Sequence, residues 1–112
     1  MNAEEIRDYA LSLKNVTEGF PFGEETLVFK TNAKIFLLVS LSSSPLQFNV
    51  KCDPIYAIEL REQYSCVVPG YHMNKKHWNT IIIDGSLTKG ALIKMIKDSY
   101  LLVLREISLP AH

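Results

Sequence analysis

Cysteine is scarce in this 112-residue chain, and the two present, Cys52 and Cys66, form neither a Cys-x-x-Cys pair nor a cluster with histidine. Their spacing therefore argues against a structural zinc site. Isolated cysteines are typical of reduced thiols in the cytoplasm, where we expect this protein. We expect no cofactor and no bound metal.

Long apolar runs are also missing. The longest apolar-rich segment, residues 35–41, is much shorter than the roughly 20 residues that cross a bilayer. The first residues are acidic and lack the apolar core of a signal peptide. We therefore expect a soluble protein without a membrane partner. A 47% apolar composition over this length indicates one compact domain, residues 1–112.

Net charge is absent as well, because 12 basic and 12 acidic residues cancel. A neutral chain does not coat nucleic acid by charge alone, although a local basic patch is compatible with this balance. The charges are unevenly distributed along the sequence. Acidic residues crowd the first quarter, and none occurs between Gln63 and Ile83.

The most distinctive stretch, residues 69–79, lies inside this acid-free region. It holds the only tryptophan, two of the three histidines and the only adjacent pair of lysines. No other window combines polar, aromatic and basic residues in this way. We therefore place the candidate functional site here.

Apolar periodicity predicts the element order α-β-β-β-α-β-β-α. Asn2 is expected to cap a first helix, Asp53 a second, and Ser86 or Thr88 a third. Strands are predicted over residues 26–31, 34–41, 46–51, 66–68 and 78–84. This order favours an α+β fold of two layers, an antiparallel sheet with helices on one face. The opposite face would be free for a partner.

Several segments resemble the MmcQ/YjbR family. They are residues 22–23, 27–30, 49–54 and, most specifically, 69–80, and the resemblance extends over nearly the whole chain. It implies a small bacterial domain with a CyaY-like fold, related to double-wing domains. It also implies DNA binding, a role given to the family by analogy of fold. It supplies no catalytic residues.

The residues of this stretch suit non-catalytic contact with DNA. Lys75 and Lys76 can neutralise phosphates, and the amides of Asn74 and Asn79 can bond to backbone or base edges. Aromatic side chains can stack on exposed bases, and a neighbouring strand can extend the patch. The candidate site comprises Asn49, Lys51, Tyr71, His72, Asn74, Lys75, Lys76, His77, Trp78 and Asn79.

Three alternatives stay open. Trp78 and the histidines can serve packing and turn formation alone. The stretch can instead bind a protein partner or a second copy of the chain, whose acidic first helix would face it. An enzyme using His72 or His77 as a general base is the least favoured reading, because no serine or cysteine nucleophile adjoins either one.

Overall fold

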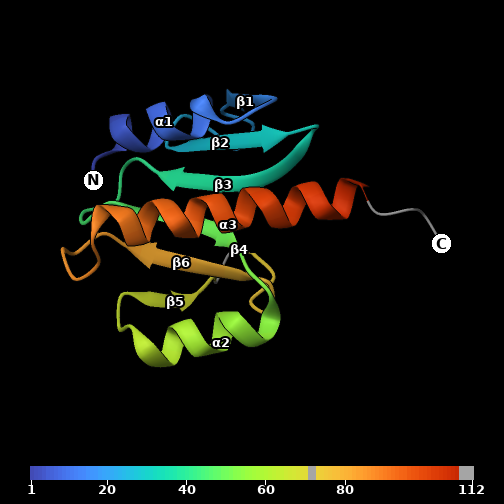
Figure 1. Cartoon of the computed structure of the whole chain (residues 1–112). Helices are drawn as coiled ribbons and strands as arrows, with labels where there is room; N and C mark the ends of the chain where they lie inside the picture. Colours follow the sequence, from blue (N-terminus) through green and yellow to red (C-terminus); the bar gives the residue numbers. More distant parts are fainter. Residues whose placement is uncertain (71–72, 109–112) are drawn as a thin grey trace.

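The computed structural model describes residues 1–70 and 73–108 of the chain (Figure 1). Three helices and six strands follow one another in the order α1 (Ala3–Ser12), β1 (Val16–Gly19), β2 (Thr26–Thr31), β3 (Lys34–Ser40), β4 (Gln47–Lys51), α2 (Pro54–Gln63), β5 (Val67–Pro69), β6 (Trp78–Ile82) and α3 (Lys89–Ser108).

All six strands belong to one antiparallel sheet in the spatial order β1-β2-β3-β4-β6-β5. The predicted fold class, an α+β domain with an antiparallel sheet, is confirmed. The predicted element order was one strand short, because β1 was not recognised. Val16 is the only large apolar residue in this four-residue strand, so no alternation signals it. Pairing with β2, from Val16 opposite Thr31 to Gly19 opposite Val28, forms it instead.

The main core lies between the helices and one face of the sheet. Ile6 and Ala10 of α1, Leu60 of α2 and Ile96 of α3 join a single buried cluster with alternate residues of the strands. The strands contribute mainly Leu27, Phe29, Phe36, Leu37, Val39, Phe48, Val50, Val67 and Ile81. The predicted caps at Asn2 and Asp53 are present, and each accepts backbone N–H groups of the helix that it begins.

A β-bulge and a serine fix the position of α3 along the sheet. Phe29 pairs with Leu37 and Lys30 with Ile35, so Phe36 is left as an extra residue in β3. The buried hydroxyl of Ser99 in α3 donates to the Phe36 carbonyl at 2.6 Å and accepts the Lys51 N–H at 2.8 Å. The middle of α3 is thereby held beside the start of β3 and the end of β4.

The other face of the sheet is not fully open. Val28, Leu38 and Trp78 form a second buried cluster there, and Ile35 and Met73 pack against it. Met73 comes from the β5–β6 connection, which therefore folds over this face. In the part of the chain that the structure describes, no helix is long and apolar enough to cross a membrane.

Candidate nucleic-acid interface

Most of the candidate stretch lies in the connection between β5 and β6, and we call its described residues, 70 and 73–77, the basic hairpin. The Gly70 N–H donates to the Trp78 carbonyl at 3.0 Å, and the carbonyl of Asn74 accepts the N–H of His77 and of Trp78 at 3.1 and 2.9 Å. A Cβ at position 70 would lie 3.0 Å from Cβ of Trp78, so glycine permits this close approach.

Arg61 of α2 anchors the basic hairpin. Its Nε donates to Asn79 Oδ1 at 2.6 Å, and its Nη2 donates to the carbonyls of Lys75 and Trp78. The Asn79 amide in turn donates to the Ala57 carbonyl at 3.4 Å. Arg61 is half-buried, so it does not lie on a fully solvated helix face. Its planar fork instead bonds several acceptors at once and ties α2 to the hairpin.

Trp78 and Asn79 belong to the scaffold rather than to the surface. Trp78 is 8% exposed within the second cluster, and Asn79 is 1% exposed beneath α2 with both amide atoms bonded inside the protein. The packing alternative for Trp78 is therefore confirmed. In this conformation, neither side chain is placed to stack on a base or to contact a base edge.

Among the described residues of the basic hairpin, Asn74, Lys75 and Lys76 are exposed and His77 is half-buried. Asn74 Oδ1 accepts the Lys76 N–H at 2.9 Å, and the His77 carbonyl accepts the Cys52 N–H at 2.7 Å. These bonds hold both lysines on an ordered turn. Tyr71 and His72, also predicted site residues, lie outside the described residues.

Asn49 and Lys51 in β4 are both half-buried and already bonded. Asn49 Oδ1 accepts the Thr80 hydroxyl at 2.5 Å in the middle of the sheet face. Lys51 Nζ lies 2.8 Å from a carboxylate oxygen of Glu106 near the end of α3. Lys51 is close to the hairpin, since it pairs with Trp78, but its charge is balanced locally.

The fold gathers cationic residues from distant parts of the sequence at one end of the sheet. Val16 pairs with Thr31, Thr31 with Lys34, and Lys51 with Trp78, so the β2–β3 turn and the basic hairpin share an end. Figure 1 shows the end of α3 and the start of α2 at this same end. We call this the basic end; its cationic residues are Lys14, Lys30, Lys34, Lys51, Lys75, Lys76 and Arg105.

Only a few acidic residues accompany them. Asp53 caps α2, and Glu106 pairs with Lys51. The opposite end of the sheet is acidic: Glu25 adjoins the start of β2, Asp84 follows β6, and Glu5 lies near the start of α1. There Lys89 is bound to Glu5 at 2.6 Å. A chain with no net charge is thus strongly polarised from end to end.

The site offers no evident metal centre. Within residues 1–70 and 73–108, no group of three or more histidine, cysteine, aspartate or glutamate side chains is arranged to hold a metal ion. His77, the candidate general base that falls inside this range, adjoins Lys76 and Trp78 rather than a nucleophile in sequence.

Comparison with known proteins gives a consistent picture. The chain is 38% identical to the protein YbdF of Escherichia coli O157:H7 over 101 residues, which cover 90% of this chain and 83% of that one. A crystal structure of Deinococcus radiodurans protein DR2400 is similar with a TM-score of 0.87 and 34% identity, covering 97% of this chain and 89% of that one.

A crystal structure of a Pseudomonas syringae protein has a TM-score of 0.78 and 26% identity, covering 91% of this chain and 98% of its own. The family model described as YjbR matches residues 11–102, from the end of α1 to the later turns of α3. This range includes the whole sheet and the basic hairpin. The chain therefore belongs to the YjbR family.

Proposed function

We propose that this protein binds DNA without catalysis, through its basic end. The observation that carries the proposal is the separation of charge: lysines from β2, β3, the basic hairpin and the segment before β1 collect at one end of a chain whose net charge is zero. Lysines contribute to DNA affinity by neutralising phosphates and releasing counterions. Lys75 and Lys76 alone would give a weak site, and the surrounding lysines enlarge it.

The basic hairpin is suited to this role because it is held before any partner arrives. Arg61 and Asn74 bond its backbone, and Met73 packs on the second cluster. A preorganised loop loses less conformational entropy on binding than a loop that orders only on contact. The two exposed lysines would then meet the phosphates, and Lys34 and Lys14 lie further across the same end of the sheet.

The burial of Trp78 and Asn79 limits how much sequence such a site would read. Contacts made by lysines fix position on the duplex, whereas base edges are read by side chains that reach into a groove. Of the predicted polar contacts on the described hairpin, only Asn74 is well exposed for this purpose. We therefore expect weak, salt-dependent binding with little discrimination among sequences.

Fluorescence anisotropy of labelled duplex and single-stranded DNA at low salt tests the proposal. The hairpin variant Lys75→Ala/Lys76→Ala should lose most of the affinity. The control Lys89→Ala/Lys97→Ala removes the same charge away from the basic end and should retain it. Equal losses in the two variants, or no binding by the unaltered protein, would reject the proposed site.

The same polarity favours a second candidate, head-to-tail self-association. The acidic end of one copy could face the basic end of the next, which is an open-ended arrangement rather than a closed dimer. Sedimentation velocity over a range of concentrations separates the two functions. If the protein sediments as a monomer at every concentration, self-association is rejected and only the DNA proposal is kept. If the sedimenting species become larger with concentration and added DNA does not dissociate them, self-association is favoured.

A further inference from the structure

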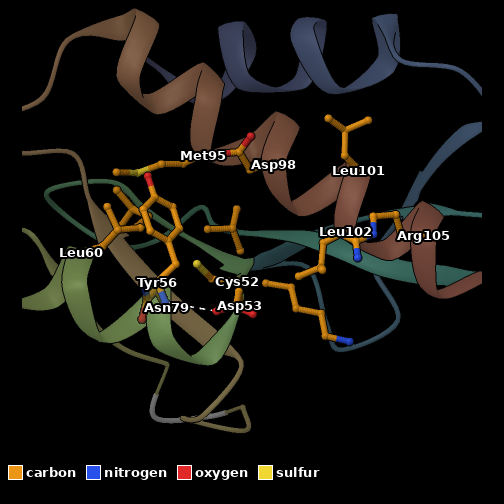
Figure 2. Close-up of a pocket in the computed structure, with 13 residues that line it drawn as sticks. Cys52, Asp53, Tyr56, Leu60, Asn79, Met95, Asp98, Leu101, Leu102 and Arg105 are labelled. Carbon is orange, nitrogen blue, oxygen red and sulfur yellow. Dashed lines mark hydrogen bonds between the residues drawn. The ribbon is translucent and has the colours of Figure 1, made fainter.

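A cleft of about 340 Å³ opens between α2 and α3, on the helical side of the sheet. Val50 and Ile81 of the sheet line it, together with Tyr56 and Leu60 of α2 and Met95 of α3. Figure 2 shows Cys52 between the side chains of the two helices. Such a volume lies at the lower end of the roughly 300–1,000 Å³ found for small-molecule sites.

The floor of this cleft disfavours negative charge. Burial raises the pKa of the Cys52 thiol from 9.0 to about 11, and the carboxylates of Asp53 and Asp98 add to the effect. Cys52 is therefore a neutral thiol at ordinary pH. An anionic group of a ligand placed there would meet the same loss of hydration and the same two carboxylates.

The polar groups around the cleft are mostly acceptors or already paired cations. Asp98 binds Lys94 through Oδ2 at 2.7 Å, and Asp53 uses Oδ1 to cap α2. Each carboxylate thus has a second oxygen that can accept a hydrogen bond. Arg105, further along α3, is exposed and also lines the cleft.

The apolar walls suit a flat ring. Tyr56 and Met95 come from different helices, and Leu101 and Leu102 complete the lining on α3. A methionine sulfur makes favourable contacts with aromatic rings. We propose that this cleft binds a small, uncharged aromatic molecule whose hydrogen-bond donor group lies beside Asp98. This inference does not rest on the proposed DNA binding, because none of the hairpin lysines lines the cleft; Lys51 and Arg105 of the basic end lie at its rim.

Three naphthalene probes of similar size test the ligand class. 1-Naphthol carries a neutral donor, 1-methoxynaphthalene lacks the donor, and 1-naphthoate is an anion at pH 7. Titration followed by amide and methyl chemical shifts should give the tightest binding for 1-naphthol. The naphthoate should bind at least about tenfold more weakly, because its charge would have to be desolvated. Shift changes should centre on Val50, Cys52 and Ile81.

Two matched variants test whether 1-naphthol binds in this cleft. Leu101→Trp fills the cleft from a side chain that is 45% exposed, so the fold should survive and 1-naphthol binding should be lost. Ile58→Trp adds the same bulk on α2, outside the lining, and should leave binding unchanged. Tight naphthoate binding, shift changes away from the cleft, equal behaviour of the two variants, or no 1-naphthol binding up to millimolar concentration would each overturn the inference.

Discussion

At the scale of single residues, Thr31 carries the clearest unsatisfied polar group, a buried hydroxyl. Its side chain is 0% exposed, and its hydroxyl has no hydrogen-bond partner in the described part of the chain. Thr31→Val keeps the shape and the β-branched character while removing the buried hydroxyl. We expect it to raise the free energy of unfolding by about 1 kcal/mol, measured by urea denaturation.

Thr80 provides the matched control. Its hydroxyl donates to Asn49 at 2.5 Å, so Thr80→Val removes a bond and leaves a half-buried amide oxygen without its donor. This variant should lose about 1 kcal/mol of stability. If both substitutions destabilise the protein equally, the Thr31 hydroxyl has a partner and the argument from burial is wrong.

Cys52 gives a prediction on pH at the same scale. The thiolate is the reactive form, and burial beside Asp53 and Asp98 holds its pKa at about 11. The rate of alkylation by iodoacetamide should therefore keep rising with pH well beyond 9.0, the ordinary value. Cys66 is 2% exposed and should react far more slowly. Asp98→Asn should lower the midpoint, since it removes one of the two carboxylates.

The same shift affects stability in a known direction. The folded protein holds the thiol proton more tightly than the unfolded chain does. The contribution of the neutral Cys52 thiol to the free energy of unfolding is therefore complete below pH 9.0. It is lost as pH rises toward about 11. Cys52→Ala should flatten the stability profile in this window. An alkylation midpoint near 9.0 in the unaltered protein would show that the thiol is well hydrated.

At the scale of elements, the basic hairpin depends on α2 through Arg61. Arg61→Met keeps the apolar stem but removes the bonds to Asn79 and to the carbonyls of Lys75 and Trp78. We expect the free energy of unfolding to fall by about 1.5–3 kcal/mol, the range for hydrogen bonds to a charged group. Hydrogen exchange at the Gly70 and Trp78 amides should become faster.

Arg7→Met is the control for that change. Arg7 pairs with Glu18 at 2.7 Å, but its side chain is 48% exposed, and such surface pairs contribute about 0–1 kcal/mol. A loss no larger for Arg61→Met than for Arg7→Met would mean that the hairpin is held by its own turn and by Met73 instead.

The strands and caps show which elements the sequence predicts well. The strand predicted over 26–31 has the bounds of β2, and the predicted caps of α1 and α2 are present, because apolar pattern and capping chemistry are local. β1 was missed because only its pairing with β2 makes it a strand. The role of Arg61 was not predicted, because its partners Lys75, Trp78 and Asn79 are distant in sequence.

At the scale of the whole molecule, the charge separation is a product of topology. The sequence predicted a basic stretch at Lys75 and Lys76 but not that Lys14 and Lys34 would join it. Strand register brings them to the same end of the sheet. The cleft between α2 and α3 was likewise not predicted, since helical periodicity identifies a buried face but not the angle between two helices.

The central claim is that the lysines of the basic end act together on DNA. The most direct measurement is the slope of log affinity against log salt concentration for duplex DNA, in the unaltered protein and in Lys14→Ala, Lys34→Ala and Lys75→Ala/Lys76→Ala. Each lysine that meets a phosphate should reduce the slope by about 1 when removed. The control Lys89→Ala/Lys97→Ala should leave it unchanged. Slopes that stay the same in all the basic-end variants would contradict the account.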